Sequence, residues 1–251
     1  MARQKGIIKL KGTIGDVSFY KTKDGYLARE KGGVDGDRIK NDPAFQRTRE
    51  NGSEFGRAGK AGKVIRDSIR LLMKNASDPR VTSRLTKELM KVIKSDTANV
   101  RGERAVVDGD LQLLDGFDFN ENGKLGSTLY VGYTAGLDRA GGAHTLDLPS
   151  FVPESSIAYP PGATHYKIVF GGVEIDFANE TFVFDQASSG EIELGSQTEA
   201  DLQLELNMTA GSTDDIFLIL GIDFLQEVNG VMYPLKNGSF NPLSIVSIDE
   251  V

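Results

Sequence analysis

The sequence contains no cysteine and no tryptophan, and only two of its 251 residues are histidine. Without cysteine the chain has no disulfide, no thiolate nucleophile and no thiolate ligand for a metal ion. The two histidines, His144 and His165, do not form an H-x-x-x-H or H-E-x-x-H pair. The sequence also has no G-x-S-x-G motif and none of the glycine-rich patterns that bind nucleotides. We therefore expect a protein that is not an enzyme and that uses no cofactor.

Long apolar segments are missing as well. The longest one, residues 216–222, is far too short to span a bilayer. Residues 1–15 carry basic side chains but lack the apolar stretch of a secretory signal peptide. These absences predict synthesis in the cytoplasm and no membrane insertion. They leave open whether the protein ends up in a phage or extracellular particle.

Charge is distributed very unevenly along the chain. Residues 1–104 hold 25 of the 29 lysines and arginines but only 13 of the 36 acidic residues, a net charge of +12. Residues 105–251 hold the other 4 basic and 23 acidic residues, a net charge of −19. This asymmetry suggests an electrostatic partner for each half, and a second copy of the chain would supply both.

Residues 1–40 have the pattern of a small β-meander arm followed by a polar connector. Short β-prone runs at residues 7–10, 17–22 and 26–30 predict three strands, with turns at residues 12–16 and 23–25. The sequence Asp24-Gly25 between two such runs is a strong hairpin signal. Three short strands with few apolar residues are not stable alone, so we expect this sheet to lie against another surface.

Residues 41–104 are predicted to form a basic helical hairpin. Asp42-Pro43 and Asp78-Pro79 are helix-start signals, because aspartate suits the N-cap and proline suits the first helical position. Apolar residues follow each signal at spacings of three and four, which is typical of amphipathic helices. Three glycines in the first helix are expected to allow close packing against a partner: Gly56, Gly59 and Gly62.

Basic side chains cover the outer face of the predicted hairpin. The candidate assembly contacts lie along the first helix: Arg47, Arg49, Arg57, Lys60, Lys63, Arg66 and Arg70. Such a face is consistent with a solvated helix, with a surface for an acidic partner such as the other half of a second copy, or with nucleic-acid binding. Acidic residues interrupt the stripe, and only Phe45 and Phe55 could stack on bases, which disfavours nucleic acid.

Residues 105–251 are predicted to form an acidic antiparallel β-sandwich. Alternating apolar and polar residues at 173–177 and 202–208 predict strands with one polar face, and residues 216–222 predict a central strand covered on both faces. Asn229-Gly230 and Asn237-Gly238 predict two hairpin turns. The acidic surface would come from outward positions of strands: Glu174, Asp176, Glu191, Glu193 and Glu205. The predicted fold class is therefore α+β: an N-terminal β-meander and a two-helix hairpin, followed by an antiparallel β-sandwich.

Residues 118–125 match the first half of a calcium-binding loop. The pattern D-x-N-x-N-G-x-L makes Asp118, Asn120 and Asn122 candidate ligands. Leu129 occupies the twelfth position, where such loops carry a bidentate glutamate, so any site here would bind calcium weakly. The alternative interpretation is a polar turn that leads into a strand.

Several stretches of the first half carry a family resemblance. They are K-G-T-I-G-D-V-S-F-Y at residues 11–20, G-Y-L-A-R-E-K at 25–31, D-P-A-F-Q-R-T-R-E-N at 42–51 and E-F-G-R-A at 54–58. Together they resemble an uncharacterised protein family common in Bacteroidota bacteria. The likeness extends through G-F-D-F-N at residues 116–120. It implies a bacterial or phage setting, and it implies no activity and no catalytic residue.

These features favour a non-enzymatic structural protein that assembles head-to-tail with copies of itself into a filament, a shell or a phage particle. The arm and the two oppositely charged halves would make the contacts. One alternative is a binding module whose β-sandwich receives a glycan or a protein, with scattered aromatic candidates: Tyr130, Tyr133, Tyr159 and Tyr166. The other is a basic nucleic-acid-associated protein, which the charge of the second half disfavours by repelling phosphate.

Overall fold

A computed structural model describes residues 2–30, 32–34, 36–76 and 78–251, with only the backbone described at residues 236 and 237. The chain forms two compact units, Met1–Glu50 and Asn51–Val251. The predicted division into residues 1–40, 41–104 and 105–251 stays a prediction about domain organisation. None of the helices in the described ranges is both long enough and apolar enough to cross a bilayer.

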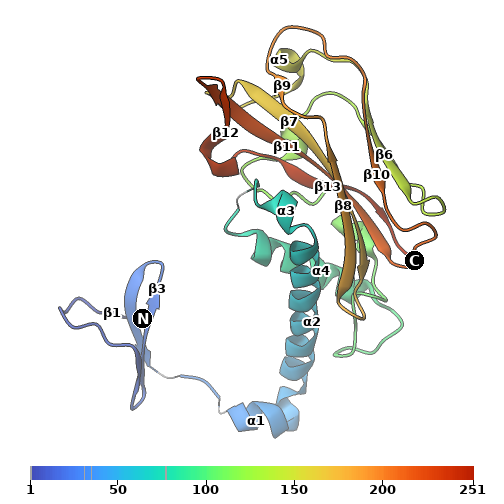
Figure 1. Ribbon diagram of the computed structural model, residues 1–251. Helices are drawn as coiled ribbons and strands as arrows, with labels where there is room; N and C mark the ends of the chain where they lie inside the picture. Colours follow the sequence, from blue (N-terminus) through green and yellow to red (C-terminus); the bar gives the residue numbers. More distant parts are fainter. Residues whose placement is uncertain (1, 31, 35, 77) are drawn as a thin grey trace. The chain divides into compact units, whose positions relative to one another are not determined.

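The first unit contains a four-stranded antiparallel sheet (Figure 1, blue). Its strands are β1 (Ala2–Arg3), β2 (Gly12–Ile14), β3 (Val17–Thr22) and β4 (Gly25–Glu30), in the order β1-β4-β3-β2. The predicted hairpin of β3 and β4 is confirmed. The predicted strand at residues 7–10 is wrong, because the amide of Gln4 holds that segment as a loop. Its Oε1 accepts from Leu10 N at 2.8 Å and its Nε2 donates to Leu27 O at 2.9 Å.

The predicted helix start at Asp42-Pro43 is confirmed, whereas the helix expected at Asp78-Pro79 begins two residues later, at Val81. Asp42 caps a short 3₁₀ turn, η1 (Pro43–Phe45), by accepting from Ala44 N at 2.9 Å, and α2 (Gln46–Ser68) follows directly. The boundary between the two units lies within α2. Asp78 accepts from Arg80 N at 2.7 Å just before α4 (Val81–Ser95). The shorter helices α1 (Gly36–Asn41) and α3 (Arg70–Met73) flank α2.

A large antiparallel sheet forms the centre of the second unit. Its two long strands, β7 (His165–Asp176) and β11 (Asp215–Val228), pair along their length. On the far side of β7 lie β8 (Thr181–Ser188) and β9 (Ile192–Glu193), and on the far side of β11 lie β12 (Val231–Pro234) and β13 (Leu243–Asp249).

The two asparagine–glycine turns have different outcomes. Asn229 and Gly230 both have positive φ and close the β11–β12 hairpin, as predicted. The hairpin predicted at Asn237-Gly238 is wrong, because residues there form the 3₁₀ helix η4 (Leu235–Gly238). The strands on either side of η4, β12 and β13, both pair antiparallel with β11 on the edge that β7 leaves free, so the chain continues along that edge instead of turning back on itself.

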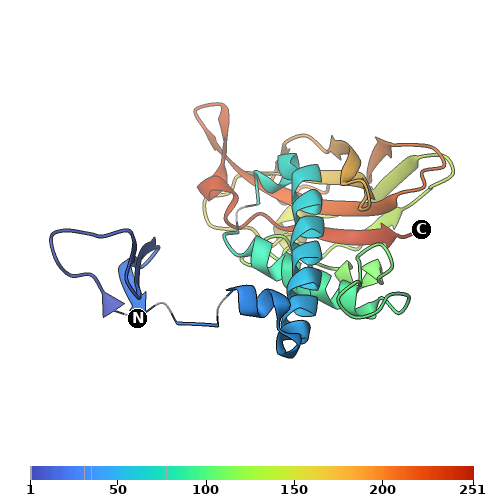
Figure 2. The same ribbon diagram turned by 90° about the horizontal axis from the view of Figure 1, so that it is seen from below.

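Two layers cover the central sheet. Helices α2 and α4 pack on one face, and a smaller sheet of β10 (Leu202–Asn207), β6 (Ala143–Leu148) and β5 (Thr134–Gly136) packs on the other (Figures 1 and 2). Strand β11 contributes to both layers: Phe217 and Ile219 face the helices, whereas Leu218 and Leu220 face the smaller sheet. The sheets meet at one side, where Asn207 N donates to the Asp185 carboxylate at 2.9 Å. This arrangement confirms the predicted α+β fold class.

Adjacent glycines in β7 let both layers approach the strand closely. A Cβ atom on Gly171 would lie 2.5 Å from Leu72 Cδ1 on the helical side. A Cβ atom on Gly172 would lie 2.5 Å from Met208 Sδ on the side of the smaller sheet. Side chains at either position would therefore push a layer away from the central sheet.

The expectation of one polar face per sheet is wrong for the central sheet, because both of its faces are covered. Glu174, predicted to point outward, is only 1% exposed. Its carboxylate accepts hydrogen bonds from Thr209 N at 2.7 Å and Ser212 Oγ at 3.0 Å. The remaining connections contain the short helices η2 (Leu111–Leu114), η3 (Leu125–Ser127) and α5 (Pro153–Ser156).

Candidate functional site

The N-terminal sheet has no core of its own. None of the described residues between 2 and 50 is buried. Residues on β3 alternate between the two faces, and directly paired residues share a face. Val17 pairs with Ile14 and Phe19 pairs with Ala28, which places these four side chains on one face. We call this the arm face; Ile14 is 63% exposed on it and Val17 is 37% exposed.

The arm is basic as a whole, although its apolar face carries both signs of charge: Lys21 shares this face with Phe19, and Glu30 pairs with Val17. Residues 2–30 contain seven lysines and arginines and three acidic residues. Lys21, at the end of β3, has its ammonium 5.5 Å from the centre of the Tyr26 ring. On the opposite face the Arg29 guanidinium lies 5.5 Å from the Tyr20 ring. The arm therefore combines an apolar face with a net charge of +4, from seven basic and three acidic residues.

Two of the predicted basic contacts have local structural roles instead of forming an open surface. Arg49 donates to Ile39 O at 2.8 Å and to Asp42 O at 2.9 Å, which joins the start of α2 to the end of α1. Arg57 donates to Arg104 O at 2.6 Å and also to Gly102 O, which ties α2 to the segment after α4.

The other predicted basic residues are more accessible, and they do not gather into one site. Lys60 Nζ lies 3.8 Å from Glu180 Oε1, and Arg70 pairs with Asp67 at 3.3 Å. Arg47 and Lys63 are exposed, whereas Arg66 is partly buried with its Nη1 unpaired in the described part of the chain.

Close packing is present at one of the three helix glycines. A Cβ atom on Gly62 would lie 3.1 Å from Leu89 Cδ1, so this glycine lets α4 approach α2. At Gly56 and Gly59 a Cβ atom would meet nothing within 4 Å among the described residues, so the expected close packing is not seen there. These two positions lie away from the α2–α4 contact.

The candidate calcium loop is held together by its own side chains. Asp118 Oδ1 accepts from Leu125 N at 3.0 Å. Asn120 is fully buried, its Oδ1 accepts from Asn122 N at 3.1 Å, and its Nδ2 donates to the carbonyl oxygens of residues 238, 239 and 241. The side chain of Asn122 is exposed. Asp118 therefore closes the loop and Asn120 ties it to the segment before β13, as in a polar turn. The strand expected after this turn is wrong, because the 3₁₀ helix Leu125–Ser127 follows and residues 128–133 form only an isolated bridge at Leu129.

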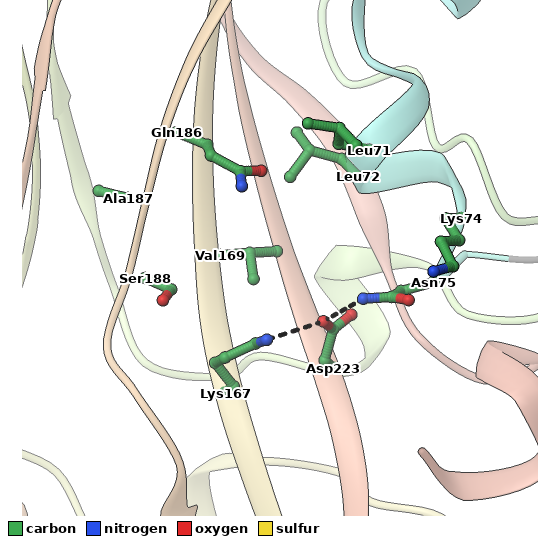
Figure 3. Close-up of a pocket in the computed structure, with 10 residues that line it drawn as sticks. All are labelled: Leu71, Leu72, Lys74, Asn75, Lys167, Val169, Gln186, Ala187, Ser188 and Asp223. Atoms are coloured by element: carbon green, nitrogen blue, oxygen red, sulfur yellow. Dashed lines mark hydrogen bonds and ion pairs between the residues drawn. The ribbon is translucent and has the colours of Figure 1, made fainter. Parts of the chain in front are cut away.

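A cavity of about 310 Å³ lies between α3 and strands β7, β8 and β11 (Figure 3). Asp223 on β11 points into it and lies 3.6 Å from Lys167 Nζ, and its Oδ2 accepts from Asn75 Nδ2 at 2.7 Å. Burial raises the pKa of the Asp223 carboxyl, while the hydrogen bond from Asn75 and the charge of Lys167 oppose that shift. Leu72 and Val169 provide an apolar wall.

One residue in the sequence signals this cavity. Asp223 interrupts the apolar residues Ile222 and Phe224 in the middle of the longest strand. A carboxylate at such a position needs partners, since burial of an unpaired charge is costly. Those partners, Asn75 and Asn241, come from distant parts of the chain, and sequence periodicity does not identify them.

The aromatic candidates for a glycan-binding surface are not equally accessible. Tyr130, Tyr133 and Tyr159 are exposed to 63%, 37% and 39%. Tyr166 is fully buried in the core between the two sheets, so its selection as a surface candidate is wrong. Its position on the central strand β7 explains the burial.

Comparison of the chain with protein-family models, with curated proteins and with solved structures finds no significant match. The resemblance to a Bacteroidota family therefore stays a prediction, and a function has to be argued from the surfaces described above.

Proposed function

We propose that this chain is a non-enzymatic structural protein that assembles with copies of itself, as a subunit of a filament, a shell or a phage particle. The observation that carries the proposal is the N-terminal sheet, which buries none of its described side chains. An isolated small sheet needs a hydrophobic face packed against another element to be stable. Burial of the arm face against a partner would meet that need, at roughly 25 cal/mol for each Å² of apolar surface removed from water.

Charge favours a second copy as that partner. Residues 2–30 have a net charge of +4, from seven basic and three acidic residues, and residues 105–251 have a net charge of −19. Contacts within one copy, such as Lys60–Glu180 and Arg80–Glu121, use only a few of the acidic side chains. An arm that binds the acidic half of a neighbour makes a head-to-tail contact, which generates rings when it closes and filaments when it does not.

The test compares the full chain with a variant that lacks residues 2–31. Size-exclusion chromatography with light scattering, at several concentrations and at low and high salt, measures the mass of each. We expect oligomers for the full chain and a folded monomer for the deletion variant, because Asn51–Val251 forms a compact unit without the arm. Negative-stain microscopy of the oligomers would then distinguish filaments from closed shells.

A matched pair of point variants separates loss of the arm face from a general effect of charge. Phe19→Asp places a carboxylate on the arm face, and Ser18→Asp places the same charge on the opposite face of the same strand. We expect Phe19→Asp to dissociate the oligomer and Ser18→Asp to leave it intact.

Three outcomes would contradict the proposal. They are a monodisperse monomer at all concentrations and salts, an unchanged oligomer after the deletion, and a monomer whose arm is protected from proteases by its own chain. Retention of DNA or RNA at low salt by a monomer would favour the nucleic-acid alternative instead, since phosphate contacts are strongest there.

A further inference from the structure

A second exposed surface of the chain combines apolar side chains with negative charge, which is opposite in sign to the net charge of the arm. A groove of about 610 Å³ lies on the smaller sheet of the second unit. Tyr133, just before β5, lines it together with Pro149 and Leu202, and the carboxylates of Asp147 and Asp201 flank these apolar groups. We call this the tyrosine groove. It combines an apolar floor with negative charge, whereas the arm combines an apolar face with positive charge.

The carboxylates of the tyrosine groove keep capacity for further donors. Asp147 Oδ1 accepts from Gln203 Nε2 at 2.6 Å, and Asp201 Oδ1 accepts from Ser150 N at 2.7 Å. An ionised carboxylate has about four acceptor positions, so each could accept more hydrogen bonds. In the described ranges no lysine or arginine forms an ion pair with either of them.

Negative charge extends beyond these two carboxylates. The pKa of the Tyr133 hydroxyl is raised by burial and also by the nearby carboxylates of Asp115 and Asp118. A phenol in a field of this sign resists ionisation and is favoured as a neutral contact for an apolar or cationic group.

The strands beside the two surfaces have free edges. Within the described ranges β5 (Thr134–Gly136) pairs with β6 alone, and β2 (Gly12–Ile14) pairs with β3 alone. Each of these edge strands is three residues long. A strand edge with unpaired backbone groups readily accepts a strand from another chain.

We propose that the tyrosine groove receives the N-terminal sheet of a second copy, an inference that rests on the proposed function and names its contact surface. The arm face covers Tyr133, Pro149 and Leu202, while Lys21 and Lys23 at the end of the β3–β4 hairpin pair with Asp147 and Asp201. Every copy carries one arm and one groove, so the contact can repeat from copy to copy.

Charge reversal tests this contact. The variant Asp147→Lys with Asp201→Lys reverses the charge of the tyrosine groove. The control, Glu191→Lys with Glu193→Lys, makes the same change in net charge at exposed positions in and beside β9. We expect the groove variant to raise the concentration needed for assembly at least tenfold. The control should assemble as the unchanged chain does.

Mixing restores the contact if the groove and the arm face each other. Lys21→Asp combined with Lys23→Asp gives an acidic arm, which should not assemble alone. An equimolar mixture of this variant with the groove variant should assemble, because each acidic arm meets a basic groove and each basic arm meets an acidic groove. Failure of the mixture, together with normal assembly of the groove variant, would overturn the proposal.

A cross-link gives a readout that does not depend on the strength of assembly. The chain has no cysteine, so a disulfide can only come from introduced residues. Ile14→Cys with Thr134→Cys should produce a ladder of linked copies on a non-reducing gel. Ile14→Cys with Val183→Cys, on strand β8 outside the groove, is the control and should not.

The outcomes separate this inference from the proposed function. If deletion of residues 2–31 abolishes assembly while the groove variants and the cross-link behave like their controls, the arm docks elsewhere and only the tyrosine groove is rejected. If the deletion variant assembles as the full chain does, both are rejected.

Discussion

Lys60 on α2 lies 3.8 Å from Glu180, in the turn between β7 and β8, so the basic helix and the acidic strands meet within a single copy. Both side chains are largely exposed, at 73% and 54%. Exposed ion pairs of this kind contribute little to stability. The apolar core between the helices and the central sheet, which includes the fully buried Leu85 and Leu89 of α4, holds the helices on the sheet.

A double-mutant cycle with Lys60→Ala and Glu180→Ala should give a coupling energy below about 1 kcal/mol, because solvent screens this pair. Urea unfolding of the four proteins measures the coupling. A value above about 2 kcal/mol would mean that the two halves are joined by charge to a much greater degree than the exposure of the pair allows.

Two glycines of α2 should respond differently to alanine. Gly59→Ala adds a methyl group where nothing lies within 4 Å, so it should stabilise the protein by up to about 1 kcal/mol through helix propensity. Gly62→Ala should gain nothing or destabilise, because the new Cβ would lie 3.1 Å from Leu89 Cδ1. Thermal unfolding of both variants provides the comparison. Equal gains would show that α4 can move away from α2 without cost.

The buried His144 should make the folded state sensitive to mild acid. Burial lowers the pKa of its imidazole, although the carboxylates of Glu174 and Asp138 partly oppose the shift. Because the unfolded chain then binds a proton at higher pH than the folded chain, stability should be lost as the pH falls below about 6.5, with a slope of up to about 1.4 kcal/mol per pH unit.

His144→Gln should remove this slope, since glutamine keeps an acceptor for Asp138 N and does not titrate. Denaturant unfolding at pH 5, 6 and 7 measures the slope, and His165→Gln, at the other histidine, serves as the control. A His144→Gln variant with the slope of the unchanged chain would assign the acid sensitivity to other groups.

Arg139 should not tolerate lysine. Its guanidinium donates to the Asp249 carboxylate at 2.6 Å and to the carbonyl oxygens of Ser212, Asp214 and Asp249 at 2.7–2.9 Å. A lysine ammonium cannot reach all four acceptors from one nitrogen, so Arg139→Lys should destabilise the protein by about 2 kcal/mol.

Chemical denaturation measures that loss, and hydrogen exchange should show faster opening at the end of β13. Arg70→Lys provides the control, because Arg70 makes one exposed pair with Asp67 and should change stability by less than about 0.5 kcal/mol. Similar losses in the two variants would argue against a special role for the contacts of Arg139.

Local signals in the sequence predicted much of the fold. Asp42-Pro43 starts a helix because the Asp42 carboxylate accepts a hydrogen bond from the backbone N–H of Ala44, two residues further along. Asn229-Gly230 closes a hairpin because both residues adopt positive φ. Where a distant residue decides the outcome, the same reasoning failed. Gln4 turns an apparent strand into a loop through a bond to Leu27, and the face that Glu174 occupies depends on which layers cover the sheet.

The candidate sites were harder to predict for the same reason. The need of the N-terminal sheet for another surface could be predicted, because its short strands contain few apolar residues. The cavity at Asp223 joins residues from α3's end, β7 and β11, and the tyrosine groove joins the starts of β5 and β10 to the end of β6. Such surfaces exist only after strands far apart in the sequence have paired, and a one-dimensional pattern does not contain that pairing.

Strand β11 belongs to both hydrophobic layers at once, which has a consequence for how residues 51–251 unfold. Neither layer can lose this strand without the other losing it too, so the helices and the smaller sheet should melt together in a single transition. A fragment cut between the helices and the strands would leave an apolar sheet face in water. The charge boundary near residue 104 is therefore a boundary in composition across one cooperative unit.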